Sequence, residues 1–220
     1  KNKLVGNTLY CYYPQEAQKI EKVGDMITFN FEKIVSLKPD LIFITVEGNT
    51  KDTYDKFREL GLKIFVSNPR NYEGIKKTYL DLATIFQIKN LASEKVAGWD
   101  SLIEKSKRLK FDIEKTAMLL IETKPIMLVG KNTFLNEYLL FNNLKNIADD
   151  SPLNYPMFNR EEVLKRNPDY IIYTSGGGET INDLISIYPE WNKLNAVKNN
   201  KIIFIDRDLY SRPGPRFAEA

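Results

Sequence analysis

The sequence contains no histidine and a single cysteine, Cys11. The lack of histidine excludes hydrolytic triads with a histidine base, zinc centres with histidine ligands and haem held by histidine. One cysteine can form no intramolecular disulfide, and without histidine it cannot be activated as in a Cys–His hydrolase. Catalysis by carboxylate, lysine or tyrosine groups stays open in principle. We nevertheless expect no enzyme activity and no resident cofactor, and we expect Cys11 to pack beside the neighbouring tyrosines.

The sequence also lacks a strong excess of charge and any long apolar run. Its 32 basic residues against 29 acidic ones give a formal net charge of +3 without a dense basic block, which argues against nucleic-acid binding. No apolar run approaches the roughly 18 residues that a membrane-spanning helix needs. No secretion signal is visible, but the sequence begins with Lys1 rather than methionine, so this is no evidence for a cytoplasmic protein.

Short apolar segments separated by helical patterns characterise the first third of the chain. Residues 40–46 (DLIFITV) form an apolar run typical of a parallel strand that is buried on both faces. Residues 63–66 form a second strand, and apolar residues at helical spacing predict a helix over residues 53–60 between them. A short helix is expected over residues 32–37, and residues 4–6 are expected to begin an earlier strand.

The middle of the chain is predicted to be helical. Residues 72–109 contain no proline and little glycine, and their apolar side chains recur at helical spacing, with a possible break near residues 89–90. A coiled coil would require a strict heptad, which the spacing does not keep. We therefore predict a long helical strut between two lobes.

The last part of the chain repeats the strand and helix patterns of the first. Residues 117–123 and 126–129 predict two strands or one irregular strand. The further expected elements are helices over residues 133–141 and 161–165 and strands over residues 170–174 and 201–205, the last of which is preceded by residues 191–197.

Residues 31–44 and 160–173 form an internal echo, because each combines a helix, a Pro-Asp pair and a buried strand. Two lobes built alike around a joining helix leave a cleft where their strand ends face each other, and α/β proteins bind ligands at such strand ends. We predict an α/β fold whose N-terminal lobe spans residues 1–72 and whose C-terminal lobe spans residues 111–220. Residues 73–110 form the helical segment that includes the interlobe helix.

Several short motifs follow one another along nearly the whole chain. They are residues 5–14 with 17–20, 34–42, 161–169, 196–201 and 212–216. In this order they resemble the family of periplasmic binding proteins for vitamin B12 and iron–siderophore complexes, and residues 10–23 (YCYYPQEAQKIEKV) are most similar to the B12-binding branch. The resemblance implies two Rossmann-like lobes joined by one long helix. The family normally has a further strand and loop before Val5 and a closing helix after Ala220.

The resemblance implies a receptor that delivers a small molecule to the membrane permease and ATPase of an ABC importer. Such a receptor works in the periplasm or at the outer face of the membrane, with a lipid anchor as one option. We expect a monomer that binds no nucleic acid.

The resemblance also points to ligand-contacting residues. Tyr10 and Tyr12 follow the first expected strand, and flat rings with a polar tip suit the edge of a corrin or porphyrin, unless these residues belong to the core. In the second lobe the expected contacts are Met127, Tyr155, Asp208, Tyr210 and Arg212. The planar guanidinium of Arg212 suits a carboxylate, phosphate or amide of the ligand, and the alternative is an ion pair with Asp206 or Asp208.

Two acidic residues are candidates for docking on the permease. Glu161 corresponds to an acidic residue by which the family's second lobe meets the permease, although the helix dipole alone also favours a carboxylate in a first turn. The matching first-lobe position is Lys51, so its neighbour Asp52 is the candidate there. The glycines at residues 176–178 lack the Lys-Ser/Thr of a phosphate loop and are expected to form a flexible turn of the cleft.

Cobalamin or a related corrinoid is the predicted ligand. A ferric siderophore is the alternative within the family, and haem is less favoured because only tyrosine could ligate its iron here. A metal-cluster enzyme scaffold of similar architecture would need several cysteines. A non-transport sensor or interaction protein on the same fold also stays open, and a permease and an ATPase encoded beside the gene would argue against it.

Overall fold

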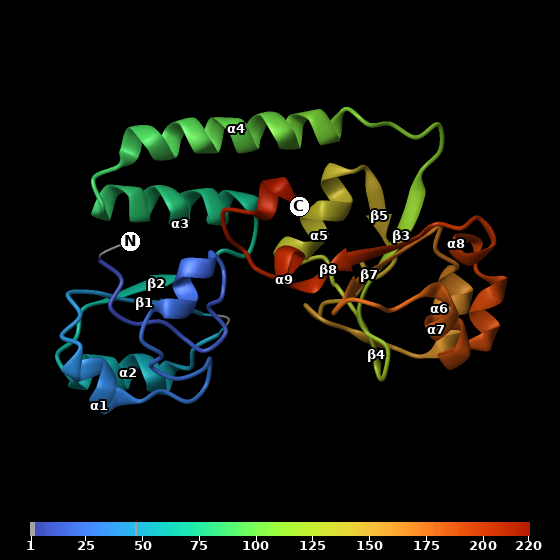
Figure 1. Cartoon of the computed structure of the whole chain (residues 1–220). Helices are drawn as coiled ribbons and strands as arrows, with labels where there is room; N and C mark the ends of the chain where they lie inside the picture. The colour runs from blue at the N-terminus through green and yellow to red at the C-terminus, as the bar shows by residue number, and fades with distance from the viewer. Residues whose placement is uncertain (1–2, 47) are drawn as a thin grey trace. The chain divides into compact units, whose positions relative to one another are not determined.

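The computed structural model describes residues 3–46 and 48–220 and divides the chain into two compact units. Unit 1 spans residues 1–68 and unit 2 spans residues 69–220. Helices and parallel strands occur in both units (Figure 1), so the α/β class predicted from the sequence is confirmed. The helices that follow residue 72 belong to unit 2. Among the described residues, no helix combines the length and apolarity that crossing a bilayer requires.

Unit 1 is built around one β-α-β element. Its helices and strands are η1 (Gln15–Lys19), α1 (Phe31–Ser36), β1 (Ile42–Thr45), α2 (Lys51–Glu59) and β2 (Ile64–Ser67). Strands β1 and β2 pair in parallel, and the Asn30 and Thr50 side chains cap the two α-helices. A small core of Ile34, Ile44 and Phe57 packs the helices against one face of the sheet.

Two expectations for unit 1 are wrong. Residues 4–6 form no strand, since the described backbone there makes only an isolated bridge between Asn7 and Lys22. Residues 40–46 are not buried on both faces, because Phe43 is 42% exposed. Phe43 is the cross-strand partner of Phe65, and their rings meet 5.8 Å apart on the face opposite Ile44. The apolar run therefore reflects a sheet whose core lies on one side only.

The helical segment consists of two helices rather than one long strut. α3 (Tyr72–Ile85) and α4 (Lys89–Lys107) contain 14 and 19 residues and lie side by side in Figure 1. Gln87 between them has a left-handed backbone with φ of 59°, which ends α3 and turns the chain back. The break at residues 86–88 lies directly before the expected position at residues 89–90. The Tyr79 and Trp99 rings, 4.7 Å apart, pack the helices together.

The sheet of unit 2 has the strand order β6-β4-β3-β7-β8, with β5 also paired to β3. Its strands are β3 (Lys115–Glu122), β4 (Ile126–Leu128), β5 (Leu144–Asn146), β6 (Met157–Phe158), β7 (Tyr170–Ser175) and β8 (Ile202–Asp206). β5, β7 and β8 run parallel to their neighbours, whereas β4 pairs antiparallel with both β3 and β6. Residues 117–129 are thus two strands, not one irregular strand.

Helices cover both faces of this sheet. They are α5 (Phe134–Phe141), α6 (Arg160–Arg166), α7 (Ile181–Ile187), η2 (Pro189–Lys193), α8 (Asn195–Lys198), α9 (Arg207–Tyr210) and η3 (Phe217–Glu219). Alternate residues of β3 face opposite cores: Met118 and Leu120 contribute to a cluster with Trp191, whereas Leu119 contributes to a cluster with Trp99. The short strands β5 and β6 and the helix α7 were not predicted from the sequence.

The internal echo has a backbone counterpart. α1 and α6 are each followed by a left-handed residue directly before proline, Lys38 with φ of 49° and Asn167 with φ of 43°. In unit 2 the Asp169 carboxylate then accepts hydrogen bonds from the backbone N–H and the hydroxyl of Thr116 on β3, at 3.0 and 3.1 Å. The same helix-to-strand turn is therefore built once in each unit.

Candidate functional site

An ammonium group organises the loop that carries the first tyrosines of unit 1. Lys22 Nζ donates to Asn7 Oδ1 at 2.7 Å and to the carbonyl oxygens of Cys11 at 3.0 Å, Ala17 at 3.2 Å and Thr8 at 3.3 Å. These acceptors surround one cation from both ends of the loop. We name residues 8–14 the tyrosine loop. Its conformation depends on Lys22, which lies within the motif at residues 10–23 but for which no role was predicted.

The tyrosines of this loop lie at the surface of unit 1. Tyr10 is 55% exposed, and Tyr12 and Tyr13 are also exposed, so these rings do not belong to the core. The Gln18 side chain donates to the Tyr12 carbonyl at 3.3 Å, and Cys11 Sγ lies 3.3 Å from the Thr8 hydroxyl. Tyr10 and Tyr12 are thus presented by a backbone held at several points, which is what an aromatic contact surface requires.

In unit 2 the carboxyl ends of β3, β7 and β8 carry charged side chains. Arg207 follows β8 and donates to the Thr174 carbonyl at 3.2 Å. Burial raises the pKa of Tyr173 on β7, and the nearby Glu122 and Glu179 carboxylates raise it further. Glu122, Glu179 and Arg207 therefore gather at the ends of the strands. No sequence motif marks these three residues, although their places directly at or after strand ends were a usable signal.

The triple-glycine turn after β7 has defined internal contacts. The Ser175 hydroxyl donates to Glu179 Oε2 at 2.6 Å, the Gly176 N–H to Oε1 at 3.4 Å, and the Gly177 N–H to Ser175 Oγ at 2.9 Å. These donors lower the pKa of the Glu179 carboxyl. Gly177 and Gly178 have φ of 107° and 87°, which only glycine adopts without strain. Hydrogen bonds to Glu179 therefore hold the turn in one conformation.

The residues predicted after β8 differ in what their side chains contact. Asp208 accepts from Arg212 Nη2 at 3.0 Å, so the ion pair considered as the alternative role of Arg212 is present, and both side chains are about half exposed. The Tyr210 hydroxyl donates to the Ala220 carbonyl, its ring packs on Tyr138 at 5.1 Å, and burial raises its pKa. Asp208 and Arg212 thus offer an exposed acceptor and donor, whereas the Tyr210 hydroxyl bonds within the unit.

Met127 and Tyr155 lie on the β4 side of the same sheet. Met127 is the cross-strand partner of Met157, which is 67% exposed, and Tyr155 is 39% exposed two residues before it. Residues 151–157, which we name the edge segment, run along β4: the Leu128 N–H donates to the Pro156 carbonyl and the Gly130 N–H to the Asn154 carbonyl, at 2.9 and 2.8 Å. Met157 was missed because a two-residue strand leaves no sequence pattern.

The two docking candidates occupy equivalent places in their helices. Asp52 lies in the first turn of α2 and Glu161 in the first turn of α6, and both are exposed. In each case a capping side chain, Thr50 or Asn159, already satisfies a backbone N–H of that turn. The carboxylates are therefore not needed as caps.

Unit 2 contains an open pocket of about 600 Å³ between α5 and β5. Its walls include Lys131, Asn136, Lys145 and Asn146, but not Met127, Tyr155, Asp208, Tyr210 or Arg212. Asn146 donates to Asn136 Oδ1 and to the Val129 carbonyl, both at 2.8 Å, so these amides serve the fold. Across the described residues, no group of three or more histidine, cysteine or acidic side chains is placed to hold a metal ion.

Comparisons with known proteins identify a family and several relatives that this chain resembles. The family described as periplasmic binding protein matches residues 1–209. The chain is 31% identical over 226 residues to the ABC transporter substrate-binding lipoprotein YvrC of Bacillus subtilis (strain 168), covering 99% of this chain and 70% of the relative. It is 32% identical over 218 residues to a vitamin B12-binding protein of Photorhabdus laumondii, covering 97% and 75%.

A solved structure shows the same fold. The crystal structure of a possible iron-binding (periplasmic solute-binding) protein from Staphylococcus epidermidis ATCC 12228 matches with a TM-score of 0.83 and 27% identity, over 98% of this chain and 86% of the other. Together with the family match over most of the sequence, this shows that the chain belongs to the periplasmic binding protein family, whose members bind substrates for transport.

Proposed function

We propose that this protein captures cobalamin or a related corrinoid and delivers it to the permease of an ABC importer. The observation that carries the proposal is the tyrosine loop: exposed rings on a backbone fixed by Lys22. A corrin is a large, mostly apolar ring whose rim bears amide groups. Tyrosine rings offer apolar contact area to the corrin ring, and their hydroxyl groups can hydrogen-bond to its rim amides. The vitamin B12-binding relative supports this ligand class.

The charge at Arg212 favours an amide-bearing ligand over an anionic one. Because Asp208 partly neutralises Arg212, the pair presents a donor and an acceptor side by side. Amides need both, whereas the carboxylates of haem would be better served by a cation without an acidic partner. We propose a ligand-contacting surface on each unit, formed by Tyr10 and Tyr12 on unit 1 and by Met127, Tyr155, Asp208, Tyr210 and Arg212 on unit 2.

A ferric siderophore is the second candidate. It is favoured by the Staphylococcus epidermidis structure, which is described as that of a possible iron-binding protein. An iron complex with amide or catechol groups on its rim would use the same exposed aromatic and polar side chains. Haem is a third ligand to be tested, and the ion pair at Arg212 argues against it.

We also propose how the protein meets its partners. Glu161 and Asp52, exposed in first helical turns, contact basic residues of the permease, which works with an ATPase. The protein acts as a monomer outside the cytoplasm, in the periplasm or at the outer face of the membrane. The relative YvrC is a lipoprotein, which supports a lipid anchor.

Calorimetric titration with cyanocobalamin, a ferric siderophore and haemin in parallel tests the ligand. We expect saturable binding of cyanocobalamin that is lost or at least tenfold weaker in Tyr155→Ala and Arg212→Ala, since desolvated aromatic and arginine anchors typically contribute more than about 1.4 kcal/mol. Arg108→Ala, which removes an exposed arginine after α4, is the matched control and should bind normally. Binding of the iron complex alone would change the ligand and keep the function.

A further inference from the structure

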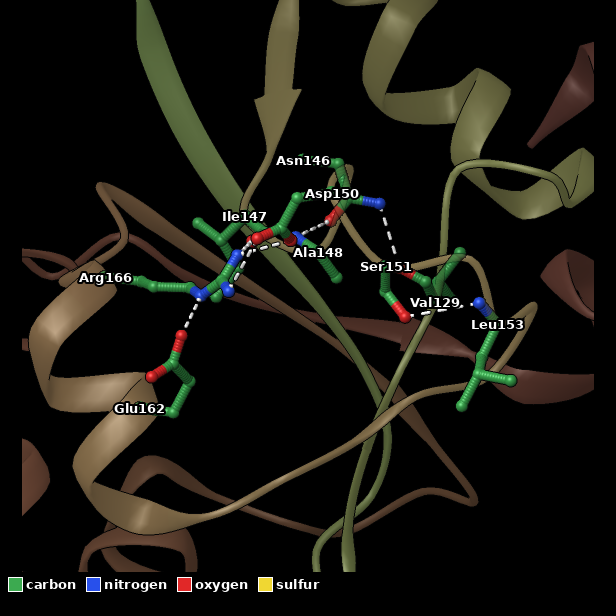
Figure 2. A network of polar contacts seen from close by, with 9 residues as sticks. All are labelled: Val129, Asn146, Ile147, Ala148, Asp150, Ser151, Leu153, Glu162 and Arg166. Atoms are coloured by element: carbon green, nitrogen blue, oxygen red, sulfur yellow. Dashed lines mark hydrogen bonds and ion pairs between the residues drawn. The ribbon is translucent and has the colours of Figure 1, made fainter.

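Arg166, in the last turn of α6, contacts a turn of the chain some twenty residues earlier. Its Nη1 and Nη2 donate to the two carboxylate oxygens of Asp150 at 2.7 and 2.9 Å, and Nη1 also donates to the Ile147 carbonyl (Figure 2). Its Nε donates to Glu162 Oε1 at 2.6 Å on the same helix. The planar guanidinium is therefore fixed by Glu162 on one side and holds the 147–150 turn on the other.

The same turn is held from its other side by a buried amide. Asn146 ends β5 and is 3% exposed, and its Oδ1 accepts from the Ala148 N–H at 2.8 Å (Figure 2). Its Nδ2 donates to the carbonyl of Val129, the residue directly after β4. Asn146 thus ties the turn to the sheet, and Arg166 ties it to α6. The two together determine where the chain leaves the turn.

The chain leaves this turn directly into the edge segment that carries Tyr155. The Leu153 N–H donates to Ser151 Oγ at 3.2 Å, and the next carbonyl, that of Asn154, accepts from Gly130. A Cβ at position 130 would lie 2.1 Å from the Leu153 carbonyl oxygen, so the segment approaches β4 as closely as a glycine permits. A displacement of the 147–150 turn would therefore move Tyr155.

The Arg166–Asp150 ion pair is expected to contribute little to the free energy of folding. The Asp150 side chain is 62% exposed, and ion pairs that water reaches contribute little to folding. A two-bond arginine–carboxylate contact instead fixes distance and orientation. The hydrogen bonds from Arg166 lower the pKa of Asp150, so the carboxylate stays charged, and the contact persists, at lower pH than for an ordinary aspartate.

We propose that Arg166 is a positioning residue for ligand binding, which joins the edge segment with Tyr155 to helix α6 with Glu161. The proposal rests on the proposed function of Tyr155 and Glu161. It adds a mechanical link: ligand contact at Tyr155 steadies α6 through Asp150 and Arg166. The ligand-contacting segment and the docking helix then respond to ligand as one body.

Hydrogen–deuterium exchange and calorimetry on the same variants test this link. Arg166→Gln removes both the positive charge and the two-bond geometry of the guanidinium, whereas Arg166→Lys keeps the charge and loses that geometry. Asp150→Asn removes the negative charge of the partner. Lys165→Gln removes an exposed positive charge from the neighbouring position of α6 and is the matched control. In ligand-free protein, Arg166→Gln should speed exchange over residues 147–157 about tenfold, since charge-assisted hydrogen bonds are lost, while β3 and β7 stay unchanged.

Cobalamin binding supplies the second readout. Arg166→Gln should raise the dissociation constant about two- to tenfold, the cost of ordering one or two side chains on binding. Cobalamin should slow exchange in α6 of the parent protein but not of Arg166→Gln. Parent-like exchange over residues 147–157 in ligand-free Arg166→Gln would overturn the proposal. If the parent binds none of the three ligands, the proposed function fails, and exchange in the ligand-free variants still decides whether Arg166 positions the edge segment.

Discussion

Replacing Lys22 with methionine should disorder the tyrosine loop while leaving the core of unit 1 in place. Methionine keeps the length and apolar stem of lysine but removes the group that bonds to Asn7, Thr8, Cys11 and Ala17. An ammonium has three donors, so the four oxygens share them. Hydrogen bonds to a charged group contribute about 1.5–3 kcal/mol each, and the partly exposed position of Lys22 favours the low end.

A net loss of about 1.5–2 kcal/mol in the order of the loop corresponds to roughly 10- to 30-fold weaker ligand binding, because the competent conformation becomes rare. Calorimetric titration with cyanocobalamin measures this change. Lys19→Met, which removes an exposed lysine from η1, should bind like the parent. The reasoning would be refuted if Lys22→Met bound normally while Tyr10→Ala did not, since the tyrosine loop would then keep its shape without the cation.

Three further changes probe unit 2. Gly130→Ala should displace the edge segment from β4 and weaken ligand binding at least as much as Tyr155→Ala; an unshifted crystal structure of the variant would contradict this. Phe217→Ala should lower the free energy of unfolding by about 3–5 kcal/mol in urea titrations, because Phe217 is 1% exposed and its ring lies 4.4 Å from that of Tyr138. Burial raises the pKa of Glu137, which accepts from the Tyr72 N–H. A raised carboxyl pKa means that the folded state binds the proton more tightly than the unfolded state does. The charged carboxylate therefore destabilises the fold above the raised pKa, and this destabilisation fades as the pH falls toward 4.5. Glu137→Gln, which keeps an acceptor, should therefore unfold at higher temperature at pH 7 and show a smaller gain near pH 4.5; an equal gain at both pH values would count against burial of the charge.

Local patterns predicted most of the regular elements. The apolar strands at residues 40–46, 63–66, 170–174 and 201–205 all contain observed strands, because three or more consecutive apolar residues near turn signals leave few alternatives. The internal echo also has a physical basis. In both copies the residue before proline adopts a left-handed backbone, as is common just past the C-terminus of a helix.

The errors arose where tertiary packing decides the outcome. The helical pattern continues through Gln87, so the periodicity indicated a break only approximately and did not show that the chain turns back there to form two packed helices. The apolar side chain of Phe43 suggested a core on both sides of β1, yet the described part of unit 1 builds its core on one face. The two-residue strand β6 forms because it pairs with β4, and it is too short to show an alternation of apolar and polar residues in the sequence.

The candidate site was predictable by resemblance more than by pattern. The exposure of Tyr10 excludes the core alternative for it, and the Arg212–Asp208 pair is the stated alternative for Arg212, whereas the ligand-binding roles stay predictions. Lys22 lies within the motif at residues 10–23, but its importance comes from carbonyl groups 5 to 14 residues away that only folding brings near it. The Asp150 carboxylate and the Ile147 carbonyl that Arg166 binds lie 16 and 19 residues away, so no local pattern could select Arg166. Positioning residues of this kind have no sequence signature.

Equilibrium dialysis of the unmodified protein against cyanocobalamin, with excess haemin and a ferric siderophore as competitors, tests the central claim most directly. The corrin absorbs visible light, so retained ligand can be counted per chain. We predict one cyanocobalamin retained per chain and no displacement by either iron compound. No retention, or full displacement by an iron compound, would contradict a corrinoid receptor.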